Sequence, residues 1–443
     1  MTYKNTLAFA RHLDQTDPLG QFRGRFHIPK RADNELIYLC GNSLGLQPKT
    51  TRDAINHELD VWQNLGVEGW FETLPGAGNA DTWLGYHRRC QPALAQIVGA
   101  TPAEVCPMNA LTVNLHLLLM SFYTPTPTRH KILTIAGDFP SDQYALETHV
   151  RQRGYDPATA IIEVQPRVDS PGSGGLLTMA DFKMVLQQHG PDIAMVWMSG
   201  LNYYTGQRYD MASITQLAHK QDIVVGFDLA HAIGNVPLQL HDWGVDCATW
   251  CSYKYLNGGP GAVSGVFVHE KHHAPANNGA FLPRLAGWWG YDESRRFGMK
   301  AGFVPEPGAA GWQLSTPDIL ALAAHRVAIS ITAEAGMTAI RQKSTLLTGF
   351  LEFVLRDIPS IRILTPADPS QRGAQLSLLV PEGGKALFNH LTARGIIGDW
   401  REPDCIRLAP NPLYNTFEDV WQVGEVMIMA RELGNNRTQM TQI

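Results

Sequence analysis

The sequence lacks paired cysteines. Its 443 residues include only six cysteines, which are scattered and form no CxxC pair. This absence argues against a disulfide framework and against a zinc knuckle, and it favours a reducing, cytoplasmic environment. The six are Cys40, Cys90, Cys106, Cys247, Cys251 and Cys405.

The sequence also lacks a basic surplus and a long apolar run. Lys and Arg number 36 against 41 Asp and Glu, a formal net charge of -5, so nothing favours binding to nucleic acid or to an acidic membrane. Lys4, Arg11 and Asp14 interrupt the first twenty residues, unlike the apolar core of a signal peptide. The longest apolar run, near 110–122, contains polar residues and fits a buried helix better than a membrane span.

The middle of the chain alternates short β-rich runs with stretches of helical periodicity. This alternation predicts an α/β fold with a mainly parallel sheet covered by helices. Strands are expected at 130–137, 193–200, 222–228, 247–252 and 262–270. Helices are expected between them, for example at 178–190 and 211–221.

The Gly- and Pro-rich segment 305–311 marks a change of domain. We expect residues 1–50 to form an N-terminal arm that belongs partly to the small domain. A large domain over 51–310 and a smaller C-terminal α+β domain over 311–443 would follow.

An acid and a lysine follow two of the predicted strands. Asp228 ends the strand 222–228, and Lys254 lies between the strand 247–252 and a glycine-rich turn. Taken singly, the aspartate could cap a helix and the lysine could be a solvated loop residue. Together they match what pyridoxal phosphate (PLP) requires: a carboxylate for the pyridine nitrogen and an amine that bonds the aldehyde.

A phosphate site is expected at the segment 108–119. Its polar start, with Asn109 and Thr112, leads into an apolar helix whose N-terminal N–H groups could bind an anion. Many helices begin this way, so the signal alone is weak. Tyr253 could bind the phosphate or act as an acid or base, although tyrosines in aromatic clusters usually only pack.

Eight motifs in this order resemble the kynureninase family over nearly the whole chain. They are YLCGNSLGL (38–46), MNALTVNLH (108–116), FPSD (139–142), SGLNYYTGQ (199–207), FDLAHAIGN (227–235), SYKYLNGGPG (252–261), GWWG (287–290) and IRLAPNPLYN (406–415). The resemblance implies a fold type I PLP enzyme with a seven-stranded sheet in its large domain. It also implies a homodimeric hydrolase that cleaves L-kynurenine to anthranilate and L-alanine in tryptophan catabolism, the kynurenine pathway and pyridine nucleotide biosynthesis.

The same resemblance assigns roles to single residues. Lys254, Asp228 and Tyr253 are the catalytic candidates, with Tyr253 protonating the β-carbon. Trp288 and Thr316 would reach the phosphate from the neighbouring subunit. The candidate cofactor contacts are Leu111, Thr112, Phe139, Pro140, Ser141, Asp142, Ser199, Asp228, His231, Tyr253, Lys254, Trp288 and Thr316.

Arg407 matches the family's carboxylate-binding arginine. A planar guanidinium can hold an α-carboxylate bidentately, which a lysine cannot imitate. Asn42, Ser43 and Ser315 are further candidates for substrate contacts.

One departure bears on specificity. Members that prefer 3-hydroxykynurenine tend to have a histidine in the segment aligned with 65–71 and an asparagine at the position of Thr316, and this chain has neither. A preference for unsubstituted kynurenine is therefore expected.

Other readings fit the residues less well. A class V aminotransferase or a cysteine desulfurase would share the fold and the lysine, but no cysteine lies in a recognisable desulfurase loop. A binding protein that had lost catalysis would be expected to lack one of the lysine, acid and arginine. A dehydrogenase would need a G-x-G-x-x-G after the first strand, which is absent. The cluster HEKHH (269–273) is expected to be an exposed turn, and no metal is predicted.

Overall fold

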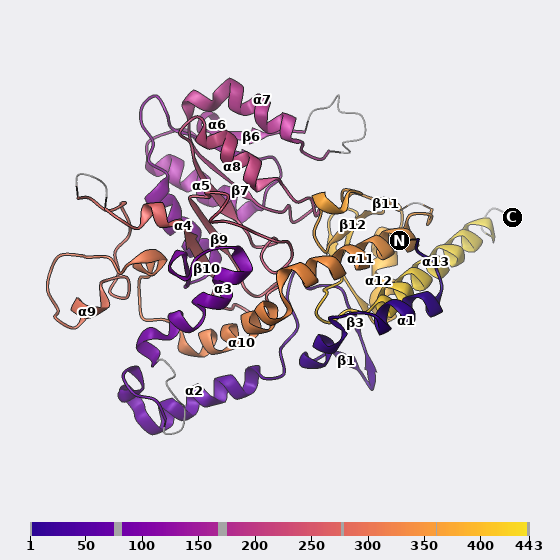
Figure 1. Ribbon diagram of the computed structural model, residues 1–443. Coiled ribbons are helices and arrows are strands. Elements are labelled where there is room, and N and C mark those ends of the chain that lie inside the picture. The colour runs from indigo at the N-terminus through magenta and orange to yellow at the C-terminus, as the bar shows by residue number, and fades with distance from the viewer. Residues whose placement is uncertain (1, 75–81, 167–174, 276–278, 360, 441–443) are drawn as a thin grey trace.

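A seven-stranded sheet forms the centre of the large domain. The computed structural model describes residues 2–74, 82–166, 175–275, 279–359 and 361–440 (Figure 1). The sheet consists, in spatial order, of β4 (Val105–Pro107), β10 (Gly265–Val268), β9 (Cys247–Trp250), β8 (Val224–Asp228), β7 (Ile193–Ser199), β5 (Lys131–Ile135) and β6 (Ile161–Val164). The strands from β9 to β6 are parallel, whereas β10 is antiparallel to both β9 and β4. The predicted mainly parallel seven-stranded sheet is thereby confirmed.

Both faces of this sheet are buried because alternate strand residues enter two core clusters. On β7, Val196 and Met198 belong to one cluster, and Met195 and Trp197 belong to the other. The helices of this domain are α2 (Thr51–Leu65), α3 (Gln91–Val98), α4 (Leu111–Phe122), α5 (Pro140–Gln152), α6 (Pro157–Ala160), α7 (Met179–His189), α8 (Met211–His219), α9 (Glu293–Arg296) and α10 (Ile319–Ala335). The apolar run near 110–122 is α4, a largely buried helix as predicted.

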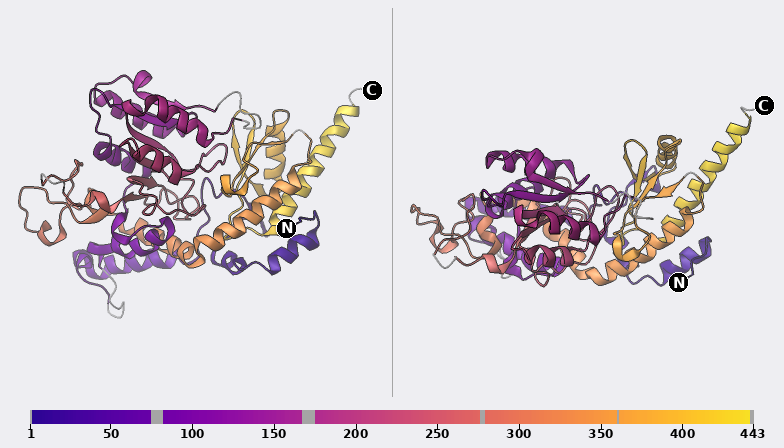
Figure 2. Two further views of the ribbon diagram at one scale, coloured as in Figure 1. Left: turned by 45° about the horizontal axis from the view of Figure 1, so that its top comes forward. Right: turned by 90° about the horizontal axis from the view of Figure 1, so that it is seen from above.

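A second, smaller sheet lies at one end of the molecule (Figure 2). It contains β11 (Arg362–Ile363), β12 (Leu376–Leu379), β15 (Cys405–Leu408) and β14 (Asp399–Arg401), all antiparallel. Its helices are α11 (Met337–Leu355), α12 (Gly384–Ala393) and α13 (Phe417–Met440). The N-terminal helix α1 (Leu7–Gln15) joins the same hydrophobic cluster through Ala10 and Leu13.

Short elements complete the fold. β3 (Ile37–Tyr38) pairs in parallel with β13 (Ile396–Ile397), and β1 (Lys30–Arg31) pairs with β2 (Asn34–Glu35). The 3₁₀ turns are η1 (Gly20–Arg25), η2 (Gly66–Trp70), η3 (Trp83–Arg89), η4 (Pro102–Glu104), η5 (Gly190–Asp192), η6 (Glu270–His272), η7 (Gly308–Trp312) and η8 (Pro369–Gln371).

Helices α10 and α11 pack in different places although only Gly336 separates them. Leu322 and Ile329 of α10 belong to a core cluster of the large domain, whereas Leu347 and Leu351 of α11 belong to that of the small one. The predicted domain boundary at 310/311 stays a prediction, and this packing supports placing it at Gly336. Within the described residues no single helix has both the length and the hydropathy to cross a bilayer; α10 and α11 meet that test only as a pair bent by 78°.

Candidate active site

Polar side chains from four neighbouring parallel strands meet at one edge of the large sheet. Ser199 ends β7, Asp228 ends β8, Lys254 follows β9, and Asp138 follows β5. The carboxyl ends of parallel strands are where open α/β sheets bind ligands. A cavity at this edge is lined by Leu111, Thr112, Asp138, Phe139, Ser141, Ser199, Leu201, Tyr203, Asp228, Ala230, His231, Tyr253 and Lys254.

Asp228 is the buried acid of this cavity. Only 5% of it is exposed, and its Oδ1 accepts a hydrogen bond of 2.7 Å from the N–H of Ala230. Burial raises the pKa of Asp228, while the positive charge of Lys254 and the Ala230 N–H oppose that rise. A cationic ring nitrogen beside this carboxylate would therefore stabilise its charged form.

Two further aspartates lie beside Asp228. Asp138 accepts hydrogen bonds from the N–H groups of Phe139 (2.9 Å) and Ser199 (2.8 Å), and burial raises its pKa to about 6. Asp142 accepts a bond of 3.2 Å from the indole of Trp197. Burial, and then repulsion from Asp228, raise the pKa of Asp142 well above its usual range, so we treat it as a neutral carboxylic acid.

Several polar atoms around this cavity are buried without a partner. Within the described part of the chain, Ser199 Oγ, His231 Nδ1 and Asp142 Oδ1 have no hydrogen-bond partner. Burial, followed by the charge of Lys254, lowers the pKa of His231 well below its usual value, so the ring is neutral. Such unmade hydrogen bonds next to an acid and a lysine fit a polar aromatic cofactor such as PLP.

Lys254 lies among aromatic rings. Its Nζ is 6.0 Å from the ring centroid of Phe139 and 5.7 Å from that of Tyr253. Burial raises the pKa of Tyr253, so its phenol stays protonated. The hydroxyls of Thr112, at the start of α4, and Ser141, at the start of α5, lie 3.0 Å apart on the cavity wall, where a phosphate could accept from both.

Arg407 lies behind the cavity rather than on its wall. It is 1% exposed, and its Nη1 donates to the carbonyl of Tyr203 at 2.6 Å, while Tyr203 itself lines the cavity. Its Nη2 pairs with Asp399. Asn42 and Ser43 lie nearby in the fold: Asn42 donates to Gln375 at 2.9 Å, and Ser43 is tied to the same Asp399.

Besides Arg407, Asn42 and Ser43, five predicted residues do not line the cavity of this chain: Pro140, Asp142, Trp288, Ser315 and Thr316. Pro140 begins α5, and Trp288, 47% exposed, lines a separate surface cleft. Ser315 and Thr316 are exposed and line another cleft together with Asn109. Trp288 and Thr316, the two residues predicted to act from a neighbouring subunit, are thus both exposed in this chain.

Sequence reasoning missed Asp138, Leu201, Tyr203 and Ala230, which line the cavity. Asp138 could have been found, because an acid three residues past the end of a buried strand lies at the same sheet edge as Asp228. The other three follow strand ends too, but their residue types carry no chemical signal.

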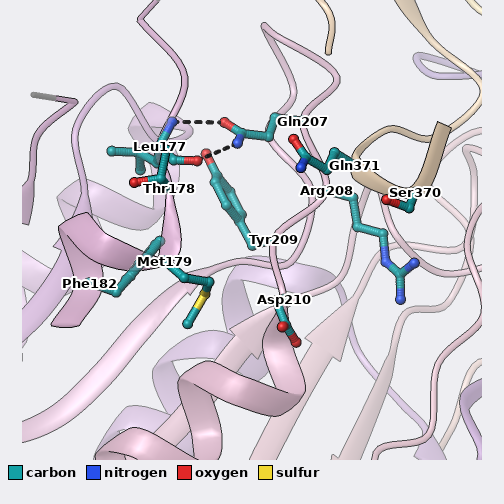
Figure 3. A pocket seen from close by; sticks show the side chains of 10 residues that line it. All are labelled: Leu177, Thr178, Met179, Phe182, Gln207, Arg208, Tyr209, Asp210, Ser370 and Gln371. Carbon is teal, nitrogen blue, oxygen red and sulfur yellow. Dashed lines mark hydrogen bonds between the residues drawn. The ribbon is translucent and has the colours of Figure 1, made fainter. Parts of the chain in front are cut away.

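A larger cleft, about 530 Å³, lies between α7, residues 207–210 and η8 (Figure 3). Most of its polar groups are already engaged, and one exception in the described part of the chain is Nε of Arg208, which has no acceptor. The amide of Gln207 exchanges hydrogen bonds with the backbone of Leu177, and Thr178 and Asp210 cap helices. Because the larger cleft contains no acid–base pair like Asp228 and Lys254, the smaller cavity at Lys254 is the better candidate despite its size.

The HEKHH segment departs from expectation. Its histidines are not in an exposed turn: His269 stacks on His241 beside buried Glu104, and His272 bonds Asp246 at 2.8 Å. The ligand atoms of Glu104, His241 and His269 lie within 4.8 Å of one another. However, Glu104 already accepts from His241 at 2.9 Å and from the N–H of Glu270 at 2.9 Å, which indicates a hydrogen-bonded structural cluster.

Comparisons with known proteins agree on one family. The family described as "Kynureninase C-terminal domain" matches residues 340–427. The kynureninase of Xanthomonas oryzae pv. oryzae (strain PXO99A) is 52% identical over 436 residues, covering 97% of this chain and 100% of that protein. The kynureninase of Koribacter versatilis (strain Ellin345) is 48% identical over 425 residues, covering 95% of this chain and 96% of its own length.

Solved structures give the same fold at low identity. The cysteine desulfurase CsdA from Escherichia coli has a TM-score of 0.72 and 16% sequence identity, covering 94% of this chain and 98% of that chain. A C-DES mutant with glycine covalently linked to its PLP cofactor also has a TM-score of 0.72, at 18% identity, covering 90% of this chain and 99% of its own. At such identities the likeness establishes the fold alone.

Proposed function

The chain belongs to the kynureninase family, and on that premise we propose how its own residues carry out the reaction. It is a PLP-dependent hydrolase that acts on the carbon–carbon bond of a ketonic substrate, converting L-kynurenine to anthranilate and L-alanine. The observation that carries the residue assignment is that Lys254 and Asp228 line one cavity together with two unpartnered buried polar atoms, Ser199 Oγ and His231 Nδ1.

We propose that Lys254 bonds the cofactor's aldehyde carbon and that Asp228 holds its protonated ring nitrogen. The N-terminus of α4, with the hydroxyls of Thr112 and Ser141, would bind the phosphate. When bound, the cofactor supplies a sink for the electrons released at the substrate's Cα.

Proton transfers fall to two neighbouring side chains. We propose that the Lys254 amine removes the proton from Cα, because it is the base that follows β9 into the cavity. Water would add to the γ-carbonyl, so that Cγ leaves as the carboxylic acid of anthranilate when the Cβ–Cγ bond breaks. The phenol of Tyr253, kept protonated by burial, would then deliver a proton to Cβ. Arg407 would bind the α-carboxylate of the substrate, and Asn42, Ser43 and Ser315 are proposed as further substrate contacts.

The experiment that tests this proposal follows anthranilate fluorescence from purified protein supplied with PLP and L-kynurenine. Wild type should form anthranilate and Lys254→Ala should form none. Lys220→Ala, which removes an exposed lysine from the end of α8, serves as the matched control and should stay active. Borohydride reduction followed by mass spectrometry should place the cofactor on Lys254; cofactor at Lys254 without anthranilate would disprove the reaction but not the cofactor site.

We also propose a homodimer with shared active sites. The segment that carries α9 projects from the body on the side opposite the small domain (Figure 1) and exposes large apolar side chains. These are Phe281, Leu285, Trp288, Phe297, Met299 and Phe303. If Trp288 completes the partner's site, mixing inactive Lys254→Ala subunits with impaired Trp288→Ala subunits should restore activity; no restoration in a verified mixed dimer would refute shared sites.

Two finer proposals concern setting and specificity. All six cysteines are free thiols, which supports a cytoplasmic location. Because Thr316 replaces the asparagine typical of enzymes for the hydroxylated substrate, kcat/KM should be higher for kynurenine than for 3-hydroxykynurenine. The reverse order would refute that preference.

A further inference from the structure

A single carboxylate gathers the groups around Arg407. Asp399 on β14 lies directly opposite Arg407 on β15 in the antiparallel register. Its Oδ2 pairs with Nη2 of Arg407, accepts a hydrogen bond of 2.5 Å from the Ser43 hydroxyl, and lies 3.2 Å from Nη2 of Arg401. Asp399 thus links β14 and β15 of the small sheet to the N-terminal segment that contains Ser43.

Charge explains why a carboxylate is needed there. Arg407 is almost completely buried, and a buried guanidinium without a counter-charge is strongly unfavourable. Burial by itself would raise the pKa of Asp399, but Arg407 and the Ser43 hydroxyl lower it further than burial raises it, so Asp399 is ionised. With Arg401, the cluster has two positive charges and one negative charge. The remaining positive charge matches one carboxylate of a ligand.

The hydrogen bonds of Arg407 leave only its Nε unused. Nη1 donates to the carbonyl of Tyr203, and Nη2 donates to Asp399 and, at 3.3 Å, to the hydroxyl oxygen of Ser43. Nε is buried and has no acceptor among the described residues. A ligand carboxylate can accept from this free Nε–H, and a bidentate contact through Nε and Nη2 would require Nη2 to exchange its 3.3 Å hydrogen bond to Ser43 for one to the ligand. Tyr203, whose carbonyl Arg407 binds, lines the cavity that contains Lys254, so Arg407 lies directly behind the cavity wall.

We propose that Asp399 is a positioning residue for Arg407: it fixes the guanidinium through Nη2 so that the free Nε–H is presented to the α-carboxylate of the amino-acid substrate. This inference rests on the proposed function of Arg407 as the carboxylate-binding group. Asp399 itself would not touch the reacting atoms.

The test compares two ligands that differ by the carboxylate alone. L-Alanine, the product, and ethylamine, which is alanine without its carboxylate, are titrated into the cofactor-loaded enzyme while the visible absorbance of the bound cofactor is followed. Asp399→Ala should weaken L-alanine binding roughly tenfold or more and leave ethylamine binding unchanged. Asp399→Asn should recover part of the loss, because its amide oxygen still accepts from Arg407. Steady-state kinetics should show the same change mainly in KM for kynurenine.

Controls separate positioning from a merely structural role. Glu402→Gln removes a carboxylate from the same β14–β15 connection, where Glu402 accepts from Trp400, and should leave both affinities unchanged. Asp399→Ala and Asp399→Asn that bind L-alanine like wild type, or that lose affinity for both ligands alike, would overturn the inference. The variant Arg407→Gln shows whether a negative result concerns the role of Arg407 or only that of Asp399. If it keeps the preference for L-alanine, the role proposed for Arg407 fails together with the inference; if it loses that preference while Asp399→Ala keeps it, only the inference fails.

Discussion

Replacing Asp246 with asparagine should destabilise the large domain. Asp246 immediately precedes β9 and is 4% exposed. One carboxylate oxygen lies 2.7 Å from Nζ of Lys271 and 2.8 Å from Nε2 of His272; the other lies 2.8 Å from Nε2 of His219 and accepts from the N–H of Val225 at 2.8 Å. An amide keeps the shape but removes the charge and one acceptor. We expect a loss of about 3 kcal/mol in the free energy of unfolding, the scale for breaking a buried charged network.

The stability difference between wild type and Asp246→Asn should depend on pH in a defined direction. Burial alone would raise the pKa of Asp246, but the hydrogen bonds from His219 and His272 and the charge of Lys271 lower it well below its usual value. A depressed pKa in the folded state stabilises the fold above the pKa of an unfolded aspartate, about 3.9. The difference between wild type and Asp246→Asn should therefore be complete at pH 5 and shrink as the pH falls below about 4.

Urea unfolding followed by tryptophan fluorescence measures this difference. Asp242→Asn, an exposed acid in the same connection, is the matched control and should change stability little. Equal stability of Asp246→Asn and wild type, or a difference that grows as the pH falls below 4, would refute the reasoning.

Other substitutions probe buried groups elsewhere. His325 on α10 is buried, and neither ring nitrogen has a partner among the described residues, while burial lowers its pKa to about 4; methionine there should stabilise the fold by about 1–2 kcal/mol. This variant should also lose less stability than wild type as the pH falls from about 6.5 to 4, because in wild type the unfolded histidine binds a proton in that range and the folded one does not. Thermal melts of both proteins at two pH values check this, and the same loss in both would contradict it. Lys343 and Asp17 form a buried ion pair of 2.6 Å, so Lys343→Met leaves the Asp17 carboxylate without its counter-charge. This variant should lose about 3–5 kcal/mol in urea unfolding, and adding Asp17→Leu should restore part of the loss. No recovery would point to another cause. Gly226→Ala would place a Cβ 2.4 Å from the ring of Trp197 and should cost about 1–3 kcal/mol by the same assay, a neutral effect being the contrary result.

The sequence predicted the large sheet better than the small one, for a physical reason. Buried parallel strands such as 193–199 are continuous apolar runs flanked by amphipathic helices, and both signals are local. The strand 399–401 is short and only partly buried, so nothing local marks it as an element. The partner that Asp399 finds in Arg407 exists only after two short strands have paired.

The same distinction applies to the site. Lys254 and Asp228 were predictable because each directly follows an apolar strand. The place of Asp138 past a strand end was predictable in the same way, but its hydrogen bond from the N–H of Ser199, sixty-one residues away in the chain, was not. Likewise, HEKHH gave no sign of its buried partners: Glu104 and Asp246 approach it from distant and separate segments. The action of Trp288 and Thr316 across a dimer stays a prediction.

The division of the site between two folded units has a mechanical consequence. Lys254 belongs to the large sheet and Arg407 to the small one, and the helices that connect the two units bend by 78° at Gly336. On the proposed assignments, a bound amino acid attached at its nitrogen to one unit and at its carboxylate to the other acts as a non-covalent cross-link. The distance between the amine and the carboxylate of the ligand therefore has to match the spacing of the two units. A molecule whose carboxylate is one bond further from its amine could not make both attachments unless the small unit turned about Gly336.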